Sequence, residues 1–171
     1  AGSITLEESH KNVSQGLNTL FRQNLNQLSD GIHRLRVTLF YSNNLSTGGS
    51  ARDGLVVKFS QNFSNDIFKS EDATKFANMD EDVAIQKEDT RLSIEGRNFP
   101  TDGEFIQLHN AKYRGTDYTY RIYFDGIPGV DAFLLDQFTQ TLTPLNVGAY
   151  TFYNFTVAAN NTATTDASRF R

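Results

Sequence analysis

Acidic side chains are the first residues of this 171-residue chain whose types and spacing could do chemistry. They gather in two polar stretches separated by about ten residues, and Ca²⁺ prefers such clustered oxygen ligands. The chain has no EF-hand pattern, so solvated loop charges and strand-end turns are the expected interpretation. Calcium binding stays open as the alternative. The side chains concerned are Asp66, Glu71, Asp72, Asp80, Glu81 and Asp82.

Other catalytic arrangements have little support in the sequence. Paired carboxylates can hydrolyse glycosides across a cleft, but no spacing here places such a pair. His10, His33 and His109 lie far apart and form no HExxH pattern. There is no GxSxG motif and no Cys, although a Ser-His-Asp triad can assemble from distant positions. We therefore expect no catalytic residues, no cofactor and no enzyme activity.

Exposed aromatic rings offer a second kind of chemistry, because they can stack on the faces of sugars. Tyr41, Tyr113, Tyr118 and Tyr123 are the candidates. Aromatic residues of strands are more often part of a core. Tyr123 is the best of the four, since it alternates with the apolar side chains of its own strand.

Composition limits the partners. The net charge is −4 and the Lys and Arg residues are dispersed, so we expect no nucleic-acid partner. No apolar run approaches the roughly 20 residues that a membrane-spanning helix needs, so we expect no transmembrane segment. The chain has 14 Phe and 7 Tyr but no Trp, a bias that favours sheet.

Two alternating runs within residues 32–60 organise the elements that must position these side chains. Leu35, Val37 and Leu39 share one face of the first run, and Leu55 and Val57 share one face of the second. A period of two predicts half-buried strands. The polar segment 42–52 between them is expected to be a surface loop.

Further short strands follow, separated by turn signals. Residues 118–124 alternate most strongly, and residues 150–158 are apolar on both faces, as a central strand would be. Segment 13–28 reads as a short helix or an irregular segment. The pattern predicts an all-β, antiparallel, jelly-roll-like sandwich. The other expected strands cover residues 74–78, 83–85, 91–95, 104–112, 132–139 and 141–145.

Several short motifs follow one another in a fixed order along the chain. They are Ile4–Lys11, Leu20–Arg22, His33–Leu39, Asp53–Phe59, Asn65–Asp66, Asp72–Phe76, Leu92–Arg97 and Asp166–Arg171. This order is similar to that of the β-sandwich region that precedes the C-terminal sorting signal in surface proteins of Bacteroidetes-type bacteria, which are cargo of the type IX secretion system. The sequence stops short of the final apolar strand of that region and contains no recognisable sorting domain, so we expect a fragment of a longer polypeptide.

The resemblance implies a non-catalytic structural or adhesive module, secreted or held on the outer surface of a Gram-negative bacterium. Its partners would be other domains of the same polypeptide, the secretion machinery or surface glycans. A carbohydrate-binding module of a secreted enzyme is the alternative. We expect residues 1–3 to be a cloning remnant or a mature end, and residues 4–171 to be one domain of a longer protein. An unpaired sheet edge could also accept a strand from another chain.

Overall fold

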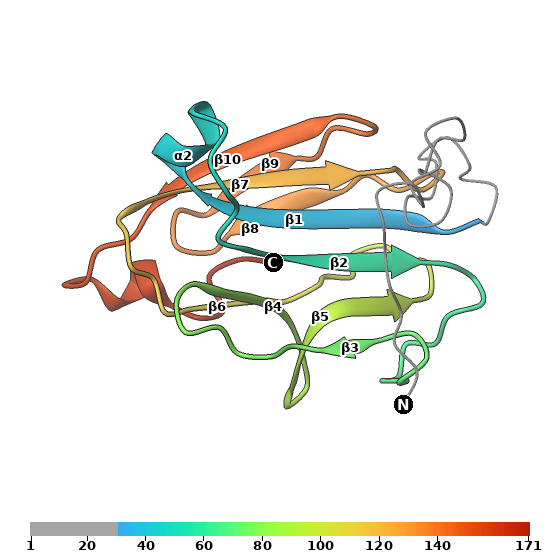
Figure 1. Ribbon diagram of the computed structural model, residues 1–171. Helices are drawn as coiled ribbons and strands as arrows, with labels where there is room; N and C mark the ends of the chain where they lie inside the picture. Colours follow the sequence, from blue (N-terminus) through green and yellow to red (C-terminus); the bar gives the residue numbers. More distant parts are fainter. Residues whose placement is uncertain (1–30) are drawn as a thin grey trace, which may run out of the picture. The chain divides into compact units, whose positions relative to one another are not determined.

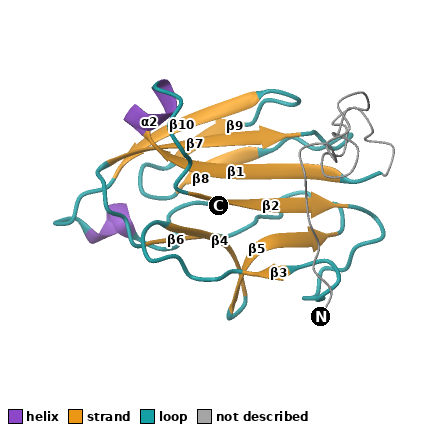
Figure 2. Ribbon diagram, viewed as in Figure 1, coloured by secondary structure: helices purple, strands orange, loops and turns teal. Residues whose placement is uncertain are grey.

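The computed structural model describes residues 31–171, and residues 32–171 form a compact unit. The segment 13–28, where a helix or irregular segment is expected, and His10 lie outside the described residues. The described part consists mainly of strands (Figures 1 and 2). The all-β class predicted from the sequence is therefore confirmed.

Eight strands form the main sheet, in the order β10–β7–β1–β2–β5–β4–β6, with β3 paired to β5 outside this path. A second sheet holds β8 and β9. All neighbours are antiparallel except β2 and β5, so the main sheet is mixed rather than wholly antiparallel. The strands are β1 (His33–Tyr41), β2 (Asp53–Phe59), β3 (Ala73–Thr74), β4 (Asp82–Lys87), β5 (Thr90–Arg97), β6 (Leu108–Ala111), β7 (Asp117–Phe124), β8 (Phe133–Asp136), β9 (Thr141–Pro144) and β10 (Tyr150–Thr156).

β1 lies between β2 and β7 and carries the centre of the core. Val37 pairs with Leu55 on one side and with Ile122 on the other, and all three side chains are buried. Side chains directly opposite each other in an antiparallel pair lie on the same face. The alternation expected for residues 32–60 and 118–124 therefore places its apolar residues in the core, as predicted.

The last five residues link the two sheets. The backbone N–H of Leu108 in β6 donates to the carbonyl of Phe170 at 3.0 Å, and that of Leu135 in β8 donates to Arg171 at 2.8 Å. The Phe170 ring packs at 4.8 Å from Phe155 in β10 and at 5.1 Å from Tyr120 in β7. Segment 167–171 thus holds β8 over the inner face of β7 and β10. The jelly-roll sandwich stays a prediction.

Two expectations about local structure are wrong. Segment 42–52 is not wholly a loop, because Ser42–Ser46 forms the short helix α2 before the chain turns back towards β2. Residues 150–158 are not a central strand, since β10 pairs only with β7 and lies at the end of the sheet path. Phe152 on this strand is 52% exposed. The apolar residues on both faces of this strand therefore do not mean that both faces are buried, because the outer face is open to solvent.

Two other strands are shorter than expected. β3 ends at Thr74, where its register with β5 is irregular, and the side chain of Lys75 forms an ion pair with Asp53 at 2.6 Å. β6 begins only at Leu108, since Glu104 accepts hydrogen bonds from the backbone and hydroxyl of Thr101 and so closes a turn. A short 3₁₀ helix, η2 (Thr162–Thr165), precedes the last segment.

Candidate functional site

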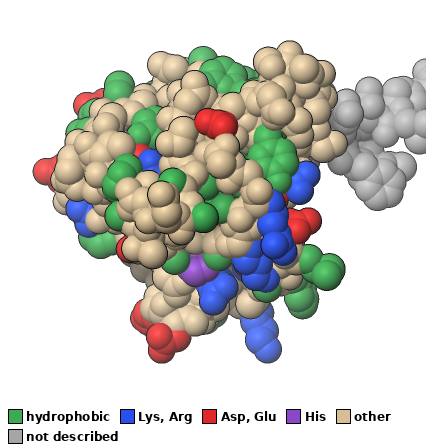
Figure 3. Space-filling view, turned by 90° about the vertical axis from the view of Figure 1, so that its left-hand side faces the viewer, with side chains coloured by type: hydrophobic (Ala, Val, Ile, Leu, Met, Phe, Trp, Pro, Cys, Tyr) green, Lys and Arg blue, Asp and Glu red, His purple; other side chains and the backbone are tan. Residues whose placement is uncertain are grey.

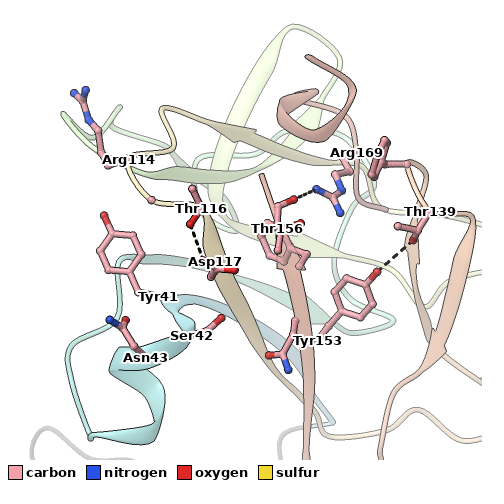
Figure 4. Close-up of a pocket in the computed structure, with 14 residues that line it drawn as sticks. Tyr41, Ser42, Asn43, Arg114, Thr116, Asp117, Thr139, Tyr153, Thr156 and Arg169 are labelled. Atoms are coloured by element: carbon pink, nitrogen blue, oxygen red, sulfur yellow. Dashed lines mark hydrogen bonds between the residues drawn. The ribbon is translucent and has the colours of Figure 1, made fainter. Parts of the chain in front are cut away.

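An open groove of about 920 Å³ lies at the end of the sheet where β10 finishes and β7 begins. Figure 4 shows Tyr41 and Asn43 on one side of it and Tyr153 and Thr139 on the other, with Asp117 between them. The first side comes from the end of β1 and from α2, and the second from β10 and the β8–β9 turn. Strands that end at a common edge thus bring distant parts of the sequence together.

A buried glutamate fixes the Tyr41 side of the groove. The hydroxyls of Tyr41 and Tyr118 donate to Oε1 of Glu81 at 2.6 Å and 2.9 Å. The Arg52 guanidinium donates to Oε2 at 3.2 Å, and the backbone N–H of Arg114 donates to Oε1 at 3.2 Å. Glu81 therefore ties β1, β7 and the two loops beside them to one carboxylate.

These donors decide the charge of Glu81. Burial acts to raise its pKa, but hydrogen bonds from Tyr41, from its own backbone N–H, from Tyr118 and from Arg114 outweigh burial. The pKa of Glu81 is lowered to about 2. Burial and the hydrogen bond to Glu81 in turn raise the pKa of Tyr41. At neutral pH Glu81 is ionised and Tyr41 is protonated.

A second buried ion pair fixes the opposite side. Nε and an Nη of Arg169 donate to the two oxygens of Asp136 at 2.9 Å and 2.7 Å. The Tyr153 hydroxyl donates to the same carboxylate at 2.8 Å. Burial acts to raise the pKa of Asp136, but the hydrogen bonds from Arg169 and Tyr153 outweigh it and lower that pKa. The Asp136 carboxylate is therefore also ionised at neutral pH, and both of its oxygens accept hydrogen bonds within the fold.

The arrangement limits what the groove can do chemically. A general acid or base works best with a pKa near the working pH. Folding moves the pKa of Glu81 and Asp136 down and that of Tyr41 and Tyr153 up, away from neutrality. These four groups hold the walls of the groove together, and their pKa values do not suit them to proton transfer near neutral pH.

In the first of the two acidic stretches, Glu71 and Asp72, which were considered as calcium ligands, accept hydrogen bonds from backbone N–H groups. Asp72 accepts the N–H of Phe68 at 2.7 Å and that of Gly96 at 2.8 Å. Glu71 accepts the N–H of Ser64 at 2.9 Å. Asp66 is exposed in the same loop.

The second stretch is divided between surface and interior. Asp80 is exposed and pairs with Arg114 at 3.1 Å, whereas Asp82 is buried near Lys75 and Arg91 at 3.7 Å and 4.0 Å. The expectation of solvated loop charges is therefore wrong for Glu81 and Asp82. Between residues 31 and 171, no three His, Asp or Glu side chains are grouped to hold a metal ion.

The two described histidines lie apart. His33 begins β1, where its ring meets Phe99 edge-on at 5.6 Å. His109 lies on β6, and burial lowers its pKa, with a further contribution from Arg91. Neither lines the groove.

The four tyrosines proposed for sugar stacking have different positions. Tyr118 is fully buried, so that proposal is wrong for it, and Tyr113 packs against it at 5.0 Å beside the core. Tyr41 lines the groove. Tyr123 is half-buried on the outer face of β7, where its ring meets Tyr150 at 5.5 Å.

Sequence reasoning missed the most exposed aromatic pair on this face. Tyr150 and Phe152 of β10 are 51% and 52% exposed, and the guanidinium of Arg121 lies 5.1 Å from the Tyr150 ring. Aromatic residues occur on both faces of β10, so the alternation of side chains along the sequence could not show which rings face outwards. Pairing with β7 supplies that answer: Tyr150 lies opposite Tyr123, and Phe152 lies opposite Arg121.

Figure 3 shows another face of the described part, on which Lys and Arg side chains gather along one side. Hydrophobic side chains appear there as separate small areas, a distribution that is normal for a protein surface. No helix within residues 31–171 is long and apolar enough to cross a membrane.

Comparison with protein-family models, with curated proteins and with solved structures returned no match to the chain.

Proposed function

We propose that this chain is a non-catalytic structural or adhesive module of a secreted cell-surface protein, similar to type IX secretion cargo. The observation that carries the non-catalytic part is the use of Glu81 and Asp136 inside the fold. Each carboxylate accepts three or more hydrogen bonds from side chains and backbone. A carboxylate saturated in this way does not exchange protons near neutral pH.

The surface location rests on the resemblance in motif order. Several of those motifs correspond to strands of one sheet, including His33–Leu39 in β1 and Asp53–Phe59 in β2. The closing motif, Asp166–Arg171, contributes the segment that joins β6 to β8. The shared motifs thus mainly form strands and the segment that links the sheets. This is consistent with a structural module whose outer surface contacts a partner.

Antibody labelling of intact cells that make the parent polypeptide tests the location. We expect labelling of intact cells, with little increase after permeabilisation. Labelling that appears only after permeabilisation would place the protein inside the cell and contradict the proposal.

A carbohydrate-binding module is the second candidate, and the exposed rings of Tyr150 and Phe152 favour it. Aromatic rings on an open face can stack on sugars. A glycan array distinguishes the two candidates: glycan binding that is lost in Phe152→Ala favours the second, and the absence of binding favours a scaffold. Phe76→Ala is the matched control, because Phe76 is 91% exposed in a loop far along the chain from β10.

A further inference from the structure

The outer face of β10, β7 and β1 forms one continuous set of paired rows, and these three strands run side by side in Figure 1. Register places residues of the three strands directly opposite one another. We name the nine residues the outer face. In rows, they are Tyr150–Tyr123–Arg36, Phe152–Arg121–Thr38 and Asn154–Thr119–Phe40.

Aromatic rings dominate the outer face at its open edge. The rings of Tyr150 and Phe152 lie 6.1 Å apart on the terminal strand, and Tyr123 stands against Tyr150 at 5.5 Å. β10 has no partner strand on its other side within the described residues. The rings of Tyr150 and Phe152 are therefore open to a ligand from this edge. The third row is covered, because Thr119 and Phe40 are buried and the Thr119 hydroxyl forms a hydrogen bond with Ser42 of α2 at 2.9 Å.

The charge of the outer face is one-sided. Arg121 lies between the rings of Phe40 and Tyr150, 4.7 Å and 5.1 Å from their centres. Neither Arg121 nor Arg36 forms an ion pair with any residue in 31–171, and Nε of Arg121 is buried without a hydrogen-bond partner there. None of the nine residues is acidic.

An unneutralised guanidinium beside exposed rings suits a ligand that carries both anionic groups and sugar faces. Guanidinium groups pair with carboxylates in a fork geometry, and rings stack on pyranose faces. The net charge of −4 does not oppose this pairing strongly, because charges more than about 10 Å away are screened at physiological salt. We infer that the outer face binds a polysaccharide whose sugars carry carboxylate groups.

This inference rests on the second candidate function, carbohydrate binding, and gives it a ligand class. Polygalacturonate is the probe, and isothermal titration calorimetry with the full chain, starting at physiological ionic strength, is the measurement. We expect binding that weakens as salt is added, because salt screens the charge contribution. Arg121→Gln and Phe152→Ala each lower the affinity by about tenfold or more.

Lys69→Gln and Phe76→Ala are the controls, because they remove a charge and a ring from exposed positions elsewhere and leave the affinity unchanged. A thermal melt verifies that each variant is folded. Should Arg121→Gln unfold, Phe152→Ala decides the question, since its ring is half exposed.

Each of the following outcomes overturns the inference: no binding of polygalacturonate, unchanged affinity in the outer-face variants, equal binding of neutral dextran, or equal binding of poly-L-glutamate. Tighter binding of an oligodeoxythymidylate than of polygalacturonate also overturns it. If the protein is found on the cell surface but does not bind polygalacturonate, this inference is contradicted and the proposed location is not. A chain that binds polygalacturonate but stays inside the cell contradicts only the proposed location.

Discussion

Three consecutive acidic residues show how strongly tertiary partners determine the role of a side chain. Asp80 is exposed, whereas Glu81 and Asp82 are almost completely buried. Only Glu81 gathers two tyrosine hydroxyls and an arginine. A buried carboxylate is tolerated where charged and neutral donors replace its lost water.

Replacing Glu81 by Gln should lower the free energy of unfolding by about 2 to 4 kcal/mol, because an amide replaces a carboxylate that accepts from Arg52 and two tyrosines. Urea denaturation measures the loss. Asp80→Asn is the matched control and should change stability by less than about 0.5 kcal/mol, since its ion pairs are exposed. Equal losses in the two variants would show that Glu81 is not an anchor.

Stability should fall at acid pH, and Glu81 sets the range. Its pKa is lowered from an ordinary value of 4.5 to about 2 by folding. A carboxyl with a lower pKa in the folded state stabilises the fold fully above its unfolded pKa, and this contribution is lost as the pH falls through the folded pKa. The lowered pKa of Asp136 acts in the same direction.

Melting temperatures between pH 7 and pH 2 test this prediction. We expect a decline that begins near pH 4.5 and continues towards pH 2, and a shallower decline in Glu81→Gln. Parallel curves for the wild type and the variant would mean that another group causes the acid sensitivity.

Two elements determine how the sheets stay together, the central strand β1 and the segment 167–171. β1 is flanked on both sides, so its inward residues are surrounded by other strands. The final segment depends instead on Arg169, whose guanidinium also donates to the carbonyls of Thr156 and Thr164 at 2.8 Å and 3.0 Å. One side chain thereby joins β8, β10 and η2.

Arg169→Ala should destabilise the protein by about 3 to 5 kcal/mol, because it leaves Asp136 buried without its cation. Chemical denaturation checks the magnitude. Arg171→Ala, whose guanidinium lies over Phe105 at 4.8 Å at the surface, should cost less than about 1 kcal/mol. A small loss in Arg169→Ala would refute the linking role of this residue.

Leu39→Ala tests the core of β1. Leu39 is completely buried, so the lost contacts and the remaining cavity should cost about 2 to 5 kcal/mol. Phe76→Ala should change stability by less than about 0.5 kcal/mol, because Phe76 is almost fully exposed. Denaturation curves that shift equally for the two variants would show that β1 does not lie at the core.

At the scale of the whole molecule, the alternation of apolar and polar residues predicted the strands that have one exposed and one buried face. β1, β2 and β7 match the expected ranges because their inward apolar residues recur every second position. The β8–β9 hairpin lies where it is expected, but β8 is shorter than the expected strand and Leu142 of β9 is 58% exposed. Alternation failed at β10, where both faces carry aromatic residues and only the strand order decides which is covered. It also could not reveal the parallel pairing of β2 with β5, in which Val56 lies opposite Ile94, 38 residues later in the chain.

The candidate site was still less predictable. Tyr123 was singled out from its position opposite an apolar face, and the structure places it on the outer face beside Tyr150. Nothing in the local sequence distinguishes Glu81 from its neighbours or shows that Arg121 forms no ion pair within residues 31–171. Both properties come from residues far along the chain, so they become visible only when the strands are placed side by side.

An NMR titration of the ¹⁵N-labelled chain with short oligogalacturonides tests the central claim most directly, that this protein works by binding through a sheet face. We predict amide shifts concentrated on β7 and β10 around Arg121, Tyr123, Tyr150 and Phe152, and an oligosaccharide whose length is unchanged. Shifts confined to the groove around Tyr41 and Asp117, or a shortened oligosaccharide, would contradict the account.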